Sequence, residues 1–309
     1  MTLGNLREAQ EGLAGVAVRT RLIEVALPAG GTAWLKCELE QPVGAFKLRG
    51  AYTALRRLSP SDRARGVVTH SSGNHGRAVA WAAKQFGVRA VIVMPADAPE
   101  VKIAGVRADG GEIVFVQHRS ERVPTAERLE KEQGLVSIPP YEHRDVIAGQ
   151  ATVGLEILEQ LPEVQEILVP VGGGGLLAGI CAAVSGVAPE VHVTGVEPEG
   201  AAKLSAALAA KRPVPVDSPH SIADGLLPPQ LGAIPWSCVS GVVSGAVTVS
   251  DESIGAAVRY LHEVAGLRVE PSGAATVAAL LAGTPVRTPV VAVLSGGNVD
   301  PGIFQRLVA

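Results

Sequence analysis

The sequence contains four consecutive glycines, Gly172, Gly173, Gly174 and Gly175, between an apolar β-branched run and an apolar run with helical spacing. This order of strand, turn and helix start predicts a phosphate site. Backbone N–H groups without side chains can close around an anion, and the helix terminus adds partial positive charge. No Gly-Lys-Ser/Thr follows, so the loop is not a P-loop. A turn that binds nothing would need only one glycine, and each further glycine costs conformational entropy.

The same glycines also fit a dinucleotide-binding pattern, which leaves a second class of cofactor open. Gly173, Gly175 and Ala178 stand at the spacing of that motif. Glu197 lies about 20 residues further on, where a ribose-binding acid belongs. The loop alone therefore does not separate a nicotinamide-dependent oxidoreductase, or a non-catalytic nucleotide-binding module, from an enzyme with another phosphorylated cofactor.

A second loop, THSSGNHG over residues 69–76, gathers hydroxyl, amide and backbone N–H groups at the start of a predicted helix. Such a loop suits a carboxylate or another anion, although Ser72 or Asn74 could also serve as an ordinary helix N-cap. The candidate substrate-binding residues are Ser71, Ser72, Gly73, Asn74 and His75.

Lys47, within GAFKLRGA, is the candidate nucleophile. If its side chain faces a pocket, burial lowers the pKa of the amine and makes it reactive. Phe46 precedes it, and Ser295 follows an apolar strand elsewhere in the chain. A phosphate loop, a reactive lysine beside an aromatic ring, an anion-binding loop and a serine at a strand end are together the parts that pyridoxal 5′-phosphate requires.

The elements that must position these residues alternate between strands and helices, which predicts an α/β fold with mostly parallel sheets covered by helices. Ligands in such folds bind beyond the carboxyl ends of the strands. The predicted strands are Ala33–Glu38, Gly66–His70, Ala90–Met94, Glu112–Val116, Ile167–Val171, Val191–Val196 and Pro289–Leu294. The predicted helices are Phe46–Arg57, Gly73–Phe86, Arg144–Gln160, Gly175–Val184 and Glu252–Val264. The irregular stretch His220–Gly232 is expected to be a surface excursion.

Composition excludes several classes of protein. A chain of 309 residues that is 47% hydrophobic can bury one large core or two moderate ones. Its net charge of −3 and the lack of a basic run argue against nucleic acid as a partner. The three cysteines form no CxxC pair, which favours a reducing compartment. Neither a signal-peptide pattern nor a membrane-spanning apolar run occurs, so we expect a soluble, cytoplasmic protein that does not bind membranes.

The motifs resemble the threonine/serine dehydratase and serine racemase family, the fold type II pyridoxal-phosphate enzymes. The resemblance extends from about Leu22 to Asp300, nearly the whole chain, in the order and spacing of that family. It rests on the motifs GAFKLRGA, SSGNHG, VIAGQ, PVGGGGLLAG, GVEPEG, ADG, VEPSGA and LSGGNVD.

The resemblance implies a tryptophan synthase β-like architecture of two open, mostly parallel twisted sheets flanked by helices. A small domain, residues 52–144, is expected to be inserted in a large cofactor-binding domain, residues 1–51 and 145–309. The active site is expected in the cleft between them. Family members are homodimers or homotetramers, so the same is expected here.

The resemblance also implies a role for each site residue. Lys47 matches the Schiff-base lysine, and Phe46 matches the aromatic that packs on the cofactor ring. Asn74 matches the residue that hydrogen-bonds the phenolic oxygen, and Ser295 the partner of the pyridine nitrogen. Gly172–Gly175 match the phosphate loop. Ser71, Ser72 and His75 fall in the loop that grips the substrate carboxylate.

Some positions depart from the family pattern. Metal-dependent members hold a divalent ion with a glutamate matching Glu197, a carbonyl near Ala201 and an aspartate, but Lys203 stands where that aspartate would be. An ammonium would repel a cation, so we expect no tightly bound metal. Pro139-Pro140 replaces the usual His-Pro, which could reshape the substrate pocket.

The expected activity is β-elimination, the conversion of L-threonine or L-serine to 2-oxobutanoate or pyruvate plus ammonia. Ser72 leaves amino-acid racemisation open, because racemases carry a serine at the matching position. Another β-hydroxy amino acid, such as 3-hydroxyaspartate, is a further candidate substrate. The chain ends soon after LSGGNVD, so the regulatory domain of biosynthetic threonine deaminases is not expected.

Overall fold

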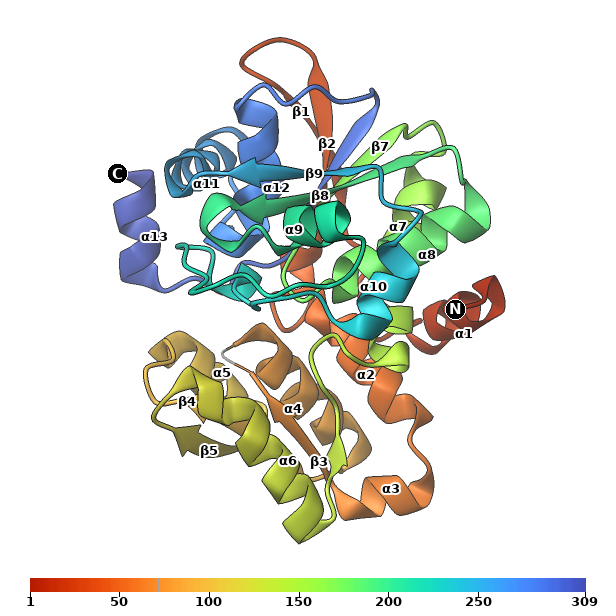
Figure 1. Cartoon of the computed structure of the whole chain (residues 1–309), viewed down its shortest axis with the longest axis vertical. Coiled ribbons are helices and arrows are strands. Elements are labelled where there is room, and N and C mark those ends of the chain that lie inside the picture. The colour runs from red at the N-terminus through yellow and green to blue at the C-terminus, as the bar shows by residue number, and fades with distance from the viewer. Residues whose placement is uncertain (72) are drawn as a thin grey trace.

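The computed structural model describes residues 1–71 and 73–309 and contains two open sheets, each covered by helices (Figure 1). The larger sheet has the strand order β1-β2-β10-β7-β8-β9. Only the β1–β2 pair is antiparallel, and the other neighbours run parallel. Its strands are β1 (Leu22–Ala26), β2 (Thr32–Cys37), β7 (Glu166–Pro170), β8 (His192–Pro198), β9 (Gly245–Val249) and β10 (Val290–Leu294).

The smaller sheet is parallel throughout, in the order β5-β4-β3-β6. It lies below the larger sheet in Figure 1. Its strands are β3 (Val67–His70), β4 (Ala90–Pro95), β5 (Glu112–Val116) and β6 (Val136–Ser137). These observations confirm the α/β class with two open, mostly parallel sheets.

Helices cover both faces of each sheet in the described part of the chain. They are α1 (Leu3–Gly12), α2 (Lys47–Arg57), α3 (Pro60–Arg65), α4 (Asn74–Phe86), α5 (Glu100–Ala108), α6 (Arg122–Gln133), α7 (Arg144–Gln160), α8 (Gly175–Val187), α9 (Lys203–Ala210), α10 (Ala233–Val239), α11 (Asp251–Ala265), α12 (Pro271–Leu281) and α13 (Pro301–Val308). None of these helices is long and apolar enough to cross a membrane.

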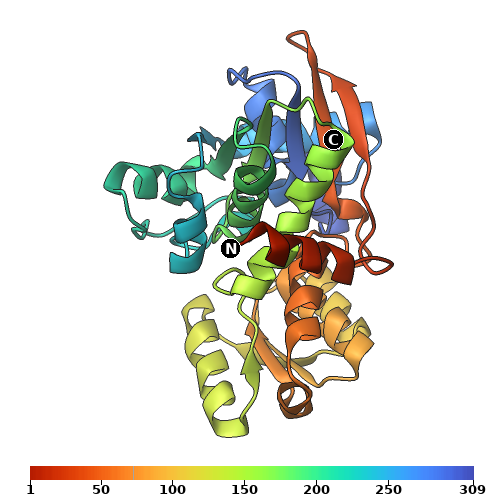
Figure 2. The same cartoon turned by 90° about the vertical axis from the view of Figure 1, so that its right-hand side faces the viewer.

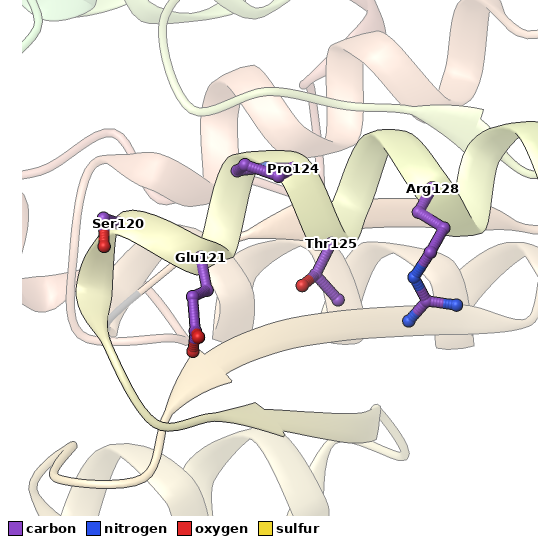
Figure 3. A pocket seen from close by; sticks show the side chains of 5 residues that line it. All are labelled: Ser120, Glu121, Pro124, Thr125 and Arg128. Atoms are coloured by element: carbon purple, nitrogen blue, oxygen red, sulfur yellow. The ribbon is translucent and has the colours of Figure 1, made fainter.

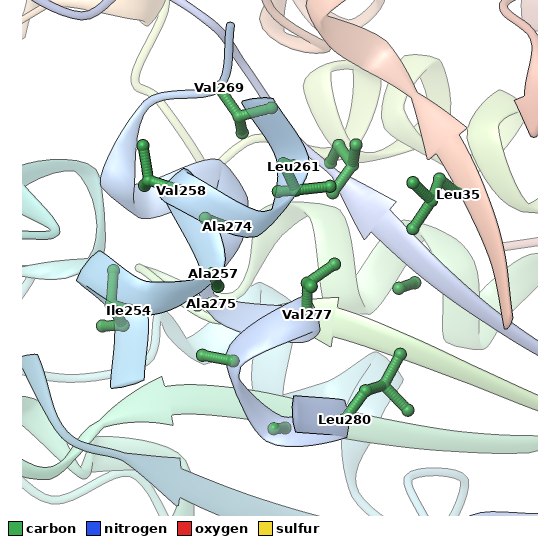
Figure 4. Packing of buried hydrophobic residues seen from close by; sticks show 14 of the residues in the cluster. Leu35, Ile254, Ala257, Val258, Leu261, Val269, Ala274, Ala275, Val277 and Leu280 are labelled. Atoms are coloured by element: carbon green, nitrogen blue, oxygen red, sulfur yellow. The ribbon is translucent and has the colours of Figure 1, made fainter. Parts of the chain in front are cut away.

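The core of the larger sheet has two sides because its central strands are buried on both faces. Every residue of β7 and β10 is buried, as expected for parallel strands between helix layers. On one face, side chains of α11 and α12 such as Leu261 and Val277 pack against β2 and β10 (Figure 4). On the other face, α7 and α8 supply Ile157 and Ile180. Figure 2 shows α1 lying across α7, where Leu6 and Ala9 are buried.

The helix α2 joins the two sheets. Its Leu48 and Leu55 pack in the core of the smaller sheet with α4, while its other side packs against α7. The predicted domain boundary between residues 51 and 52 falls inside this helix, and that boundary stays a prediction.

Several elements differ from the sequence prediction. The edge strands β1 and β9 were not predicted, and they are mostly half-buried or exposed, so they lack the continuous apolar run of a central strand. The helix α12 was not predicted either. Ten of its eleven residues are buried, so it shows no alternation between an apolar and a polar face.

The expectation that His220–Gly232 forms a surface excursion holds for most of its residues and is wrong for four of them. Ala223, Leu226 and Leu231 are buried, and the amide of Gly232 donates to the carbonyl of Gly173. The stretch therefore forms a wall beside the glycine loop. The many Pro and Gly residues gave it a loop pattern, but Ala223, Leu226 and Leu231 turn inward, while Ile222 stays 40% exposed.

Candidate active site

Lys47 is the first residue of α2, and its ammonium nitrogen donates a 2.8 Å hydrogen bond to the carbonyl of Pro140. The same nitrogen lies 5.0 Å from the centre of the Phe46 ring. Burial of the amine lowers the pKa of Lys47 to about 7. The lysine predicted as nucleophile therefore lies in a site where much of its amine is neutral near pH 7.

A buried ionic network fixes the helix that carries Lys47. The guanidinium of Arg49, 1% exposed, bonds Glu38 at 2.8 Å and Glu156 at 2.7 Å. Glu38 follows β2 and Glu156 belongs to α7, so Arg49 ties α2 to both. Lys36 also bonds Glu156, at 2.6 Å. With its charges paired inside the protein, this network holds the start of α2 in one position.

The loop after β10 lies directly against Lys47. The amide of Phe46 donates to the carbonyl of Ser295 at 3.1 Å, and Ala45 and Gly296 form a β-bridge. Ser295 is 5% exposed. Among the described residues, its hydroxyl has no hydrogen-bond partner, so it can bond a ring nitrogen.

The glycine loop joins β7 to α8 and has no room for side chains. Gly174 has φ of +93°, a left-handed conformation that favours glycine. A Cβ on Gly173 would fall within the ring of Tyr141, and one on Gly172 would lie 2.8 Å from the carbonyl of Gly225. Within the described chain, no protein acceptor bonds the amides of residues 172–177. The loop therefore has the free N–H groups of an anion cradle.

Pro140 and Tyr141 connect Lys47 with the glycine loop. The carbonyl of Pro140 accepts from Lys47, and a Cβ on Gly175 would lie 3.0 Å from Cβ of Tyr141. The sequence analysis treated Pro139-Pro140 only as a departure from the family and assigned Tyr141 no role. An aromatic residue beside two prolines carries no signal of such a contact.

The loop after β3 brings Asn74 to the same place. Asn74 donates to Glu270 Oε1 at 2.5 Å, and Asn298 donates to Asn74 Oδ1 at 2.9 Å. Ser71 Oγ accepts the amide of Gly73 at 3.1 Å. Ser72, the predicted catalytic and substrate-binding serine, lies outside the described residues.

His75 faces the core of the smaller sheet. Its Nε2 lies 2.9 Å from the carbonyl of Ile138, and burial together with the nearby Lys47 charge holds the pKa of His75 well below its usual value. The imidazole is therefore neutral near pH 7. The role of His75 in substrate binding stays a prediction; its Nδ1 is buried with no hydrogen-bond partner among the described residues.

Glu270 was missed by the sequence analysis. Its side chain is 3% exposed, and its Oε2 is buried with no hydrogen-bond partner among the described residues. Burial raises the pKa of Glu270 to about 7, although the nearby Lys102 acts to lower it. The residue precedes Pro271 at the start of α12, which signals a helix start and nothing more.

Glu197 and Lys203 form a buried pair behind the glycine loop. Lys203 Nζ donates to the carbonyl of Val171 at 2.9 Å and lies 3.6 Å from Glu197. The carboxylate of Glu197 also accepts the amides of Leu204 and Ser205. Glu197 lies in β8 and is wholly buried, with its carboxylate bound to the first turn of α9. It is therefore not available to bind a ribose, which argues against the dinucleotide alternative.

A depression elsewhere on the molecule lies along the start of α6 and holds about 320 Å³. Figure 3 shows its lining residues, Ser120, Glu121, Pro124, Thr125 and Arg128. None of the predicted site residues is among them, and they include no nucleophile beside a base.

The residues gathered around Lys47 fit pyridoxal phosphate. The glycine cradle has unengaged amides for the phosphate, Lys47 has an amine that is partly neutral near pH 7 for the aldehyde, and the buried Ser295 hydroxyl has no partner among the described residues and can bond the ring nitrogen. Loops that follow β3, β7 and β10 supply these groups together with the start of α2.

Comparison with known proteins gives the same result. A family model described as pyridoxal-phosphate dependent enzyme matches residues 16–296. The L-threonine ammonia-lyase of Thermotoga maritima is 39% identical, over 100% of this chain and 78% of the relative. The serine racemase of Oryza sativa is 36% identical, over 97% of this chain and 91% of the relative. The structure of maize serine racemase has a TM-score of 0.93 and 36% identity, covering 99% of this chain and 96% of that one. The chain therefore belongs to the fold type II pyridoxal-phosphate dependent enzymes, with pyridoxal 5′-phosphate as its cofactor and with threonine ammonia-lyases and serine racemases among its relatives.

Proposed function

We propose that the protein is an ammonia-lyase that eliminates the β-hydroxyl of L-threonine or L-serine, giving 2-oxobutanoate or pyruvate and ammonia. The observation that carries this proposal is the amine of Lys47, which has a pKa of about 7 and bonds the carbonyl of Pro140, a neighbour of the glycine loop. A neutral amine at that point is the base that removal of a Cα proton requires.

Pyridoxal phosphate, when bound, withdraws electrons from the substrate Cα and so acidifies its proton. Lys47 would hold the aldehyde in the resting enzyme, and its amine, once freed by the substrate amine, would remove that proton. The amides of Gly172–Gly175 would bind the phosphate, while the loop of residues 71–75 would bind the substrate carboxylate. Elimination expels the β-hydroxyl with a proton, and hydrolysis of the resulting enamine releases ammonia and the 2-oxo acid.

Ser295 favours elimination over amino-group transfer. A serine hydroxyl donates a hydrogen bond to a pyridine nitrogen but does not hold it protonated, as an aspartate would. The ring is then a weaker electron sink, so a long-lived carbanion at Cα is disfavoured. Elimination suits this setting because the electrons leave with the hydroxyl.

A substrate panel on the cofactor-loaded enzyme tests the proposal. L-threonine, L-serine and threo-3-hydroxyaspartate are incubated separately, and release of 2-oxo acid and loss of optical activity are measured in parallel. We expect 2-oxo acid from L-threonine or L-serine, and none with Lys47→Ala. Release only from 3-hydroxyaspartate would replace the proposed substrate and keep the reaction class. Absence of 2-oxo acid from all three would refute the proposal.

Racemisation is the second candidate, and the presence of Ser72 favours it. A hydroxyl on the face of Cα opposite Lys47 would return the proton with inverted configuration. Ser72→Ala is expected to abolish any racemisation while leaving elimination of L-substrates. Equal loss of both activities would assign Ser72 to substrate binding.

A further inference from the structure

Lys102 crosses from the smaller sheet to the larger one. It belongs to α5, which packs with the smaller sheet. Its ammonium bonds Asp224 Oδ2 at 2.5 Å and lies 3.9 Å from Glu270 Oε2. Both acids belong to the part of the chain that forms the larger sheet and its helices. The Lys102 side chain is 8% exposed, so its charge is largely shielded from water.

The aliphatic part of Lys102 covers the loop expected to bind the substrate carboxylate. A Cβ on Gly73 would meet Cδ of Lys102 and would lie 3.0 Å from Cε and 3.2 Å from Nζ. The next residue, Asn74, donates to the same Glu270 whose other oxygen faces Lys102. Lys102 therefore contacts this loop at Gly73, and Glu270 contacts it at Asn74.

Asp224 in turn contacts the glycine loop through its neighbour. The amide of Gly225 donates to Ser272 Oγ at 2.8 Å, and the carbonyl of Gly225 would lie 2.8 Å from a Cβ on Gly172. A continuous path of contacts thus leads from the carboxylate loop, through Lys102 and Asp224, to the phosphate loop.

We propose that Lys102 is a positioning residue, whose ion pair with Asp224 and Glu270 holds Gly73 and Asn74, which follow β3 of the smaller sheet, beside the cofactor site of the larger sheet. The proposal rests on the proposed amino-acid site, but not on elimination as the reaction. Lys102 acts through the loop and does not take part in proton transfer, which belongs to Lys47. Its loss should therefore weaken binding of the amino acid more than it slows the chemical step.

Lys102→Met tests this role because methionine keeps a stem that can cover Gly73 and removes only the ammonium. In the holoenzyme, the Kd of L-alanine is measured from the change in cofactor absorbance, since alanine binds as an amino acid but has no hydroxyl to lose. We expect this Kd to rise about tenfold, because the loop that binds the amino acid is then less well positioned although no direct contact with the ligand is lost. KM for the proposed substrate should rise to a similar extent, with kcat changed by no more than about twofold.

A double-mutant cycle separates the ion pair from general damage to the fold. Asp224→Asn should raise the Kd of L-alanine as Lys102→Met does, and the double variant should be no weaker than either single one. Lys102→Arg should recover part of the affinity. Lys84→Met, at an exposed position of α4, serves as the control and should match the parent protein. Circular dichroism and cofactor absorbance check that each variant folds, and Asp224→Asn carries the test if Lys102→Met does not.

An unchanged Kd of L-alanine in both single variants, or effects that multiply in the double variant, would overturn the proposal. Failure of elimination alone would not, because alanine binding is measured without it. The two proposals can therefore fail separately.

Discussion

The chemistry proposed for this site depends on keeping one ammonium partly neutral. Lys47 is a lysine that burial deprives of water, and it donates its hydrogen bond to a neutral carbonyl instead of a carboxylate. A carboxylate partner would have raised the pKa of Lys47 and kept the amine protonated. The low pKa of Lys47 thus depends on the neutral hydrogen-bond partner as well as on burial.

The pKa of Lys47 predicts how cofactor capture depends on pH. In the cofactor-free protein the neutral amine attacks the aldehyde, and its fraction rises from about a tenth at pH 6 to about nine tenths at pH 8 for a pKa near 7. The rate of absorbance change on adding pyridoxal phosphate should rise across this range and then level off. A rate still rising steeply between pH 9 and 10 would mean that the amine has an ordinary lysine pKa.

The lowered pKa of Lys47 also affects stability. Between its folded pKa of about 7 and the unfolded value of about 10.5, the unfolded chain binds more protons. The cost of burying Lys47 is therefore largest below pH 7 and fades as the pH rises toward 10.5.

A substitution at Ser295 tests the control of reaction type. Ser295→Asp places a carboxylate where it can hold the pyridine nitrogen protonated, which makes the ring a stronger electron sink. We expect a new long-wavelength absorbance band with amino-acid substrates and slow amino-group transfer to added 2-oxo acids. If this variant shows neither change, Ser295 does not control the type of reaction. Ser295→Ala is the control and should show neither change.

At the scale of elements, the site is built where several strand ends meet. Parallel strands place their carboxyl ends on one edge of a sheet, and the loops after β7 and β10 in the larger sheet lie close to the loop after β3 in the smaller one. The helix α2 supplies Lys47 and is fixed by the buried Arg49 network. The position of Lys47 is thus fixed by the ion pairs that hold α2 against its neighbours.

The glycine loop gives a prediction at this scale. In Gly174→Ala, the added methyl meets an unfavourable φ and lies 3.0 Å from Leu231 and Pro235. Since L-residues pay about 1–2 kcal/mol for a left-handed conformation, we expect the Kd for pyridoxal phosphate to rise at least about tenfold. The measurement is equilibrium titration by fluorescence or absorbance.

Gly110→Ala is the matched control, because Gly110 has φ of +83° and open space around it, away from the loop. It should lower stability without changing the Kd for pyridoxal phosphate. Equal effects of the two variants on cofactor affinity would show that the Gly174 effect is only a loss of stability.

The buried pair of Lys203 and Glu197 predicts independence from divalent cations. The ammonium fills the space beside Glu197, and burial lowers its pKa to about 8, with Glu197 acting to raise it. A chelator should therefore leave activity and melting temperature unchanged, and added Mg²⁺ should have no effect. Activity that is lost with chelator and restored by Mg²⁺ would contradict this prediction.

Lys203→Met should destabilise the protein by about 1–3 kcal/mol, since Glu197 keeps its two amide donors.

At the scale of the molecule, the cofactor should act as a bridge between the two sheets. Its predicted contacts come from both, so binding stabilises their arrangement as well as the local loops. At a free concentration of about 100 times Kd, a ligand adds about 2.7 kcal/mol of stability, which corresponds to about 4 °C in a chain of 309 residues. Removal of pyridoxal phosphate should lower the melting temperature by that amount in differential scanning calorimetry, and an unchanged value would argue against a bridging role.

The expected homodimer or homotetramer stays a prediction, which sedimentation can check.

Much of this protein could be predicted from local sequence. The glycine loop, Lys47 and the alternation of strands and helices follow from residue types and periodicity, because backbone conformation and burial act over a few neighbouring residues. The edge strands and the wholly buried α12 could not, since their patterns depend on what packs against them.

The sequence by itself determined the α/β class, the cofactor and the residues that were expected to hold it. Only the tertiary structure decided what surrounds them. Glu270 reaches Asn74 across 196 residues of chain, and Lys102 reaches Asp224 across 122. No local pattern encodes such pairs, because each residue is unremarkable among its own neighbours. The pKa values of Lys47 and Glu270 follow the same rule, since burial is a property of the folded chain and not of the residue.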